Sequence, residues 1–157
     1  MDIVFAALTM GFVATLTIDV WAEILSKGFK LPTTNWAMVG RWFAHLPKGQ
    51  VIHKPIAASD KVKFEAAIGW VLHYVIGIVY AFIYLALLHA QPDLLSAIIF
   101  GLATVLVPWF VLQPGLGMGI FARFAPKPTM TRIINLSMHS IFGAALYLGW
   151  LMYASII

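Results

Sequence analysis

Four stretches without Lys or Arg, each long enough to cross a lipid bilayer, dominate this chain of 157 residues. All ten Lys and Arg residues fall between them, in the segments Lys27 to Lys63 and Arg123 to Arg132. A membrane-spanning helix needs about 20 mostly apolar residues, because backbone polar groups in lipid must be satisfied within the segment. The sequence therefore predicts four transmembrane helices, at residues 3–25, 66–88, 94–112 and 133–157.

The composition excludes an ordinary water-soluble domain. Hydrophobic residues make up 62% of the chain and charged residues only 10%, whereas soluble domains have roughly half and roughly a quarter. The net charge of +4 is carried by loops between apolar stretches, which favours contacts with the bilayer and anionic lipids over nucleic acid. The sequence has no cysteine, so a metal site would have to use His, Asp, Glu or backbone oxygen.

The distribution of positive charge predicts an orientation. Residues 89–93, which join the second and third predicted helices, include no Lys or Arg, whereas the loops 26–65 and 113–132 hold all ten. Because basic loops remain in the cytoplasm, both termini are expected on the opposite side. We interpret the chain as an all-α single membrane domain over residues 1–157, a bundle of four helices small enough that a homodimer would be unsurprising.

The loop 26–65 has a helical pattern of its own. Apolar residues recur there at helical spacing, at Trp36, Val39, Phe43 and Leu46. Asn35 precedes them as a start signal, and Pro47 and Gly49 follow as stop signals. The pattern predicts a short amphipathic helix that lies in the cytoplasmic membrane interface.

Polar residues within the predicted helices share single faces, and these faces should point into the bundle. A charge that faces hydrocarbon at mid-membrane costs at least about 2.5–3.5 kcal/mol. At about 1.5 Å per residue, His73 and His139 lie roughly 11 Å from the cytoplasmic boundary, and Asp19 lies at a similar level. The predicted polar cluster, open to the cytoplasm, comprises Asp19, Glu23, Glu65, His73, Asn135 and His139.

Three functions fit this cluster. The polar residues could only bond helices together, in a structural or accessory subunit. They could form a proton or cation relay, or a polar ligand site, in a small transporter-like protein, which is our leading hypothesis. Alternatively, His73 and His139 could ligate haem, or could join Asp19 around a divalent metal such as Zn²⁺, Mn²⁺ or Fe²⁺. No motif names a reaction, so the sequence does not indicate an enzyme.

The loop 113–132 is rich in glycine. No strand precedes it and no Lys-Ser or Lys-Thr pair follows it, so a nucleotide-binding loop is improbable. The loop could contact an anion or a lipid phosphate, or glycine could simply permit close packing at a turn. The anion or lipid candidates are Gly115, Gly117, Gly119, Arg123 and Lys127. Upstream of this loop, Pro108 should kink the third helix.

A short internal similarity is also present. The segment Gly11-Phe-Val-Ala-Thr-Leu in the first helix is similar to Gly101-Leu-Ala-Thr-Val-Leu in the third. The spacing of His73 to Gly77 in the second helix is repeated by His139 to Gly143 in the fourth. Matches this short fit duplication and chance similarity of helices equally well.

Several motifs of the chain resemble an uncharacterised family of bacterial inner-membrane proteins. These motifs are Gly40-Arg41-Trp42-x2-His45-Leu46-Pro47-x-Gly49-x3-His53, Ile56-Ala57-Ala58, Gly69-Trp70-x2-His73-Tyr74-x2-Gly77 and Gln113-Pro114-Gly115-x-Gly117-x-Gly119. The resemblance implies a four-helix protein of the bacterial inner membrane, and it supplies no activity or ligand. The charge distribution then predicts that both termini are periplasmic. The resemblance also draws attention to the loop. Arg41, His45 and His53 could fold back as a lid near Glu23 and Glu65.

Overall fold

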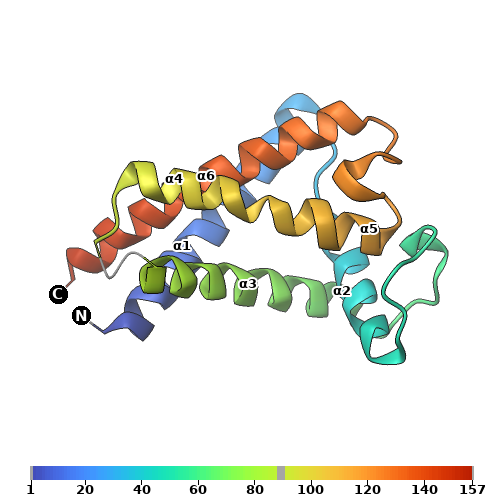
Figure 1. The fold of residues 1–157 in the computed structure, drawn as a ribbon, viewed down its shortest axis with the longest axis horizontal. Helices are drawn as coiled ribbons and strands as arrows, with labels where there is room; N and C mark the ends of the chain where they lie inside the picture. The colour runs from blue at the N-terminus through green and yellow to red at the C-terminus, as the bar shows by residue number, and fades with distance from the viewer. Residues whose placement is uncertain (1, 88–90, 157) are drawn as a thin grey trace. The chain divides into compact units, whose positions relative to one another are not determined.

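The computed structural model describes residues 2–87 and 91–156, and the regular structure in these residues is helical (Figure 1). Four helices are long and apolar enough to cross a membrane, at Ile3–Gly28, Glu65–Leu87, Leu94–Leu116 and Pro128–Ala154. The all-α class and the four predicted spans are therefore confirmed. Residues 88–90, where the second predicted span ends and the hairpin loop begins, and residue 157 lie outside the described residues.

The helix boundaries differ from the prediction where proline and π-helical turns occur. Helix α1, Ile3–Glu23, continues as a π-helical turn, Ile24–Gly28. Helix α3 is Glu65–Leu87. Helix α4 ends at Thr104, and a π-helical turn that starts at Pro108 leads into the short α5, Gln113–Leu116. Pro108 has no N–H to donate to Thr104, so the break occurs where it was predicted. Helix α6, Pro128–Ala154, starts at Pro128 because proline suits a first helical position.

Helix α2, Trp36–His45, confirms the helix predicted in the first long loop. The Asn35 side chain caps it by accepting hydrogen bonds from the N–H groups of Ala37 and Met38. A 3-10 turn follows, and Gly49 ends it in the left-handed conformation with φ of 74°. The location of α2 at a membrane interface stays a prediction.

The chain divides into two compact units, which are described separately. The first unit consists of Met1–Thr33, Tyr74–Thr104 and Leu136–Ile157. The second consists of Thr34–His73 and Val105–Asn135. The single membrane domain stays a prediction.

The first unit is a bundle in which glycine brings helices into backbone contact. A Cβ added to Gly11 of α1 would lie 2.5 Å from the Cα of Ile78 in α3, and one added to Gly101 of α4 would lie 2.6 Å from the Cα of Gly143 in α6. Small residues allow such close approach in membrane helices. Gly11 and Gly101 correspond in the internal similarity, and each brings its helix into backbone contact with a neighbouring helix. Duplication itself stays a prediction.

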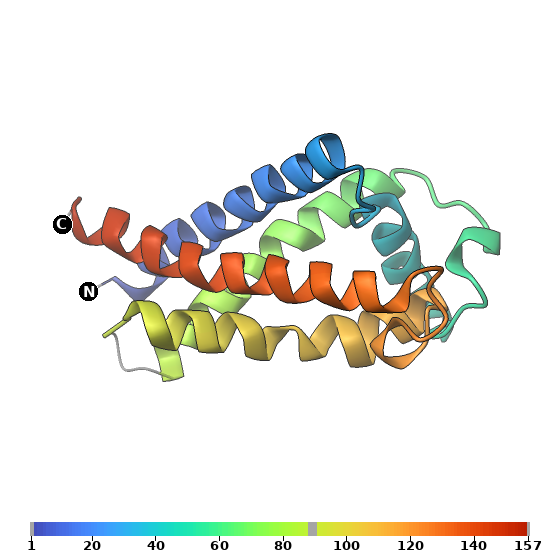
Figure 2. The same cartoon turned by 90° about the horizontal axis from the view of Figure 1, so that it is seen from above.

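Helices α1 and α6 also pack together, in antiparallel order. A Cβ on Gly149 would lie 2.6 Å from the Cα of Met10, and the Trp21 Nε1 donates to the Ser137 Oγ at 3.2 Å. The backbone N–H of Asp2 donates to the Tyr153 hydroxyl at 3.1 Å, so both termini lie at one end of this unit (Figure 2). The core residues shared by the four helices include Ala6, Met10, Tyr84, Leu85, Ala97, Leu146 and Tyr153.

The second unit forms around a crossing of α2 and α3. A Cβ on Gly40 would lie 1.9 Å from the Glu65 carbonyl oxygen, and one on Gly69 would lie 1.8 Å from the Trp36 carbonyl oxygen. Only glycine permits two helix backbones to approach so closely. On α2, the Trp42 indole also covers Gly115 of α5, with its Nε1 2.3 Å from where a Cβ would be.

Candidate functional site

Asp19 is the acidic residue deepest within the first span, and α3 supplies its hydrogen-bond partner. The Tyr74 hydroxyl donates to the Asp19 Oδ2 at 2.9 Å. One turn earlier on α1, Thr15 is fully buried, and a Cβ on Gly77 would lie 2.0 Å from its Oγ1. Gly77 therefore lets α1 approach α3 closely enough for the contact between Asp19 and Tyr74.

His139 in α6 makes an equivalent contact with α4. The Thr104 Oγ1 donates to the Gly101 carbonyl oxygen at 2.6 Å and lies 2.8 Å from the His139 Nδ1. The single hydroxyl hydrogen is used on Gly101, so the His139 Nδ1 carries a hydrogen and donates it to Thr104. In the neutral imidazole, Nε2 is then the nitrogen that can accept a proton.

These two contacts lie at the same level of the first unit. Along the antiparallel pair of α1 and α6, Met10 meets Gly149 and Trp21 meets Ser137. Residue numbers rise on one helix as they fall on the other, so the position opposite Asp19 on α6 is close to that of His139. Asp19, Tyr74, Thr104 and His139 therefore form one level of the bundle, which we call the polar layer.

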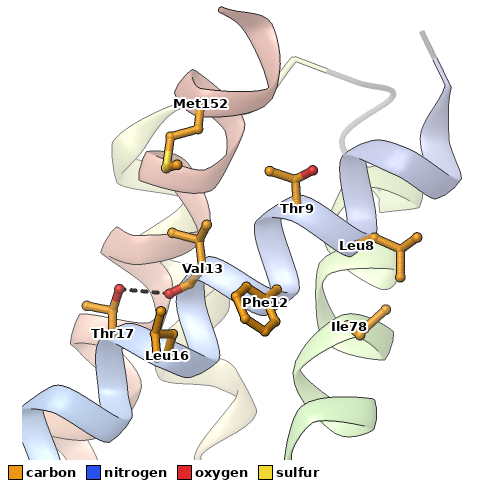
Figure 3. Close-up of a pocket in the computed structure, with 8 residues that line it drawn as sticks. All are labelled: Leu8, Thr9, Phe12, Val13, Leu16, Thr17, Ile78 and Met152. Atoms are coloured by element: carbon orange, nitrogen blue, oxygen red, sulfur yellow. Dashed lines mark hydrogen bonds between the residues drawn. The ribbon is translucent and has the colours of Figure 1, made fainter. Parts of the chain in front are cut away.

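An apolar groove lies on the outer side of the first unit, over α1 (Figure 3). Its volume is about 630 Å³. Its hydroxyl groups are already bonded within α1, because Thr9 donates to the Phe5 carbonyl oxygen and Thr17 to that of Val13. The groove thus offers no polar chemistry; its lining is Leu8, Thr9, Phe12, Val13, Leu16, Thr17, Ile78 and Met152.

Arg41 and Glu65 form a buried ion pair in the second unit. The Arg41 Nε and Nη2 each donate to one Glu65 carboxylate oxygen at 2.8 Å. The Arg41 Nη1 lies 3.2–3.4 Å from the carbonyl oxygens of Ile56, Ala57 and Ser59. The bond to Glu65 raises the pKa of Arg41, which stays charged. The structure thus brings together two residues of the lid hypothesis, and Arg41 is committed to holding the loop.

The rings of His45 and His53 form a T-shaped pair in the second unit, with centroids 5.4 Å apart. The His45 Nδ1 contacts the Gln50 Oε1, and its Nε2 lies 3.1 Å from the Asp60 carbonyl oxygen. His53 is 7% exposed, and neither of its ring nitrogens has a hydrogen-bond partner. Burial, and next the neighbouring His45, lower the pKa of His53. Burying an unpartnered polar group costs about 1–3 kcal/mol, so this imidazole lowers the stability of the unit.

His73 and Asn135, two further predicted site residues, also belong to the second unit. The His73 ring stacks on Trp36 with centroids 3.9 Å apart, and Trp70 meets it edge-on at 5.8 Å. The Asn135 Oδ1 accepts from the Trp109 Nε1 at 3.2 Å and from the Gln113 Nε2 at 2.7 Å. Helix packing accounts for these contacts. A cluster that unites His73 with Asp19 and His139 stays a prediction.

Glu23 is bonded at the surface rather than within the polar layer. It pairs with Lys27 one turn later, at 2.6 Å, and both side chains are well exposed. An exposed pair of this kind adds little to stability.

The glycine loop bonds largely to itself. The N–H groups of Gly117 and Met118 donate to Pro114 and Gln113, and that of Phe124 donates to Met118. The Arg123 guanidinium lies over the Phe124 ring, 4.5 Å from its centroid. Lys127 accepts through its carbonyl oxygen from Thr131. A tight turn accounts for these contacts, while the predicted anion or lipid contacts of Gly115, Gly119 and Lys127 stay untested.

Metal binding has no support from the described part of the chain. Within residues 2–87 and 91–156, no group of three or more His, Asp or Glu side chains is arranged to hold a metal ion. Ligation of haem or a metal by His73, His139 and Asp19 stays a prediction without a structural argument behind it.

Sequence reasoning missed Tyr74 and Thr104 as the partners of Asp19 and His139. Tyr74 appears within a family motif, and Thr104 lies one turn before Pro108, but neither position has a signal that assigns its partner. Which face of one helix meets which face of the next depends on packing, and the glycine crossings decide it here.

The fold has four helices that are long and apolar enough to cross a membrane, and ionisable groups lie within them. The chain matches the model of the family DUF2938, described as a protein of unknown function, over residues 8–153, and it belongs to that family. This confirms the resemblance to an uncharacterised family. No curated protein and no solved structure matches the chain.

Proposed function

We propose that this protein is a small transporter-like membrane protein that binds and exchanges protons, or a small cation in their place, at the polar layer. The observation that carries the proposal is the shared level of Asp19 and His139 within helices of spanning length. A carboxylate and an imidazole at one level can each bind a proton, and ionisable residues within membrane spans mark ion or proton pathways.

The cost of Asp19 supports a functional role. A charged group at mid-membrane costs at least about 2.5–3.5 kcal/mol. The bond from Tyr74 is one polar contact of the kind that recovers about 0.6–2 kcal/mol in membranes. An Asn at this position could accept the same bond without carrying a charge, which favours a functional role for the carboxylate.

His139 supplies the second exchangeable position. Its Nδ1 is held by Thr104, which orients the ring and leaves Nε2 as the proton acceptor. An imidazole nitrogen can bind and release a proton, so His139 offers a second proton-binding position.

The proposed orientation follows from the charge of the two units. All Lys and Arg residues except Lys27 and Lys30 belong to the second unit, while four of the acidic residues belong to the first: Asp2, Asp19, Glu23 and Asp93. We place the basic loops 26–65 and 113–132 at the cytoplasmic face of a bacterial inner membrane, against anionic lipids, with both termini in the periplasm. The contact between Asp2 and Tyr153 supports a common side for the termini.

The test is proton flux into liposomes that contain the purified protein, driven by a K⁺ diffusion potential and followed with an internal pH dye. Wild-type protein should acidify the lumen faster than empty liposomes, and Asp19→Asn and His139→Gln should each remove that difference. Asp93→Asn is the matched control. Asp93 precedes α4 outside the spans and caps it through Ser96, and Asn is an equally good cap.

A second arm separates a proton from another cation. A Na⁺ gradient in place of the K⁺ diffusion potential should drive Na⁺ uptake through wild-type protein only if the layer accepts Na⁺. Unchanged flux of both ions in Asp19→Asn would refute the proposal. A structural role predicts a different result, in which both substitutions lower the unfolding temperature and wild-type liposomes conduct no more than empty ones.

A further inference from the structure

The segment of residues 50–55, which we call the latch segment, is held by contacts to two other parts of the second unit. From α2, the Trp42 Nε1 donates to the Val51 carbonyl oxygen at 2.8 Å, and the His45 Nδ1 contacts the Gln50 side chain. From the glycine turn 113–119, the Gly115 carbonyl oxygen accepts from the His53 N–H at 3.1 Å.

His53 is where the latch segment meets the glycine turn. A Cβ added to Gly117 would lie 2.6 Å from the His53 carbonyl oxygen, so the two backbones are in direct contact. The His53 side chain is buried, and both of its ring nitrogens are without partners. Every hydrogen bond that holds this residue is therefore made by its backbone.

We propose that His53 is a proton-binding site, and that proton binding releases the latch segment from the glycine turn. A protonated imidazole has a full charge and two N–H donors. In the closed arrangement neither donor has an acceptor, so the charged ring is stable only after it reaches solvent.

The charges around His53 favour release. His45 on α2 faces it edge-on and directs both of its own nitrogens to other oxygens. Lys54, next in the chain, is exposed, and the turn 113–119 has no ionisable side chain. Of the two carboxylates in the second unit, Glu65 is bonded to Arg41 through both oxygens, and the Asp60 side chain is exposed. Burial and His45 accordingly lower the pKa of His53.

The extent of the movement is limited on both sides. Gly49 precedes the latch segment with φ of 74°, in a region where only glycine turns freely. After the segment, Arg41 holds the carbonyl oxygens of Ile56, Ala57 and Ser59. Residues 50–55 can thus leave the glycine turn while 56–59 remain attached to α2. This inference does not depend on the proton flux proposed for the first unit.

Hydrogen exchange of the full-length protein in detergent micelles, measured at pH 7.5 and pH 5.5 and corrected for the intrinsic exchange rate, tests the proposal. Protection of amides in residues 50–55 and 113–119 should fall by up to about tenfold for each pH unit below about 6.5. Amides of α1 and α6 should keep their protection. Equal protection of the latch segment at both pH values would overturn the proposal, and this comparison needs no variant.

Two variants assign the effect to the side chain. His53→Gln has no proton to gain in this range, so its latch segment should exchange equally at both pH values. Lys54→Gln, the adjacent exposed residue, should keep the wild-type dependence on pH. The same dependence in His53→Gln as in wild-type protein would overturn the assignment. If His53→Gln does not fold, the pH titration of the His53 ring chemical shifts in wild-type protein decides the matter, because the proposal requires a pKa below the ordinary value near 6.5. A ring that titrates at the ordinary value would overturn the assignment.

Discussion

The close crossing of α2 and α3 leads to a quantitative prediction for Gly40→Ala. The added Cβ would lie 1.9 Å from the Glu65 carbonyl oxygen, and ordinary contact begins near 3.4 Å, so α2 must move away by about 1.5 Å. Neither neighbour can yield locally, because the obstructing atoms belong to the backbone of α3.

This displacement reaches the ion pair next to the crossing. Arg41 follows Gly40, and its bonds to Glu65 are 2.8 Å long, so a movement of about 1.5 Å takes them beyond hydrogen-bonding distance. A buried charge that loses its partner costs about 3–5 kcal/mol. We expect Gly40→Ala to lower the free energy of unfolding by at least about 3 kcal/mol.

The assay is thermal unfolding in detergent, followed by tryptophan fluorescence, because Trp36 and Trp42 lie on α2 itself. The midpoint should fall by at least roughly 6 °C. Gly28→Ala is the matched control, since no atom lies within 4 Å of its added Cβ. Alanine there should be neutral or should stabilise by up to about 1 kcal/mol. A Gly40→Ala protein that unfolds at the wild-type temperature would show that α2 does not contact α3 in this way.

Two more predictions concern the same unit. Arg41→Gln and Glu65→Gln should each destabilise the protein by about 3–5 kcal/mol, because each change leaves one charge of the pair without its partner. The double variant should lose much less than the sum of the two, and additive losses of unfolding free energy would argue against the pair. The free energy of unfolding should also decrease as the pH falls. The pKa of His53 lies below its unfolded value near 6.5, so the unfolded chain binds more protons than the folded chain does. Stability is therefore lost below pH 6.5, by up to about 1.4 kcal/mol per pH unit. His53→Leu should reduce this dependence of stability on pH without lowering stability at pH 7.5, since it removes two unpartnered nitrogens. Denaturant titrations at pH 7.5 and 5.5 measure the loss of unfolding free energy between the two pH values. An equal loss in wild-type protein and in His53→Leu would contradict this account.

The candidate site was only partly predictable. Asp19 and His139 stand out in the sequence because ionisable residues in apolar stretches are rare and costly. Counting residues from the predicted boundaries also placed them at similar depth, and the contacts of α1 with α6 support a shared level. The partners Tyr74 and Thr104 did not stand out, because hydroxyl groups are common in membrane helices and the choice between them depends on how the helices are rotated.

Local chemistry, which is readable in the sequence, determined the helices of this protein. A bilayer requires each spanning segment to satisfy its own backbone, so hydropathy and length alone predicted the four helices, and Asn35 and Pro128 mark helix starts by their own side-chain chemistry. Tertiary structure decided what those helices bring together. The bond from Arg41 to Glu65 and the burial of His53 both depend on two backbones that come into contact at a glycine. Such a contact brings together residues far apart in the chain, and it depends on how the surfaces fit, which a local sequence pattern does not predict.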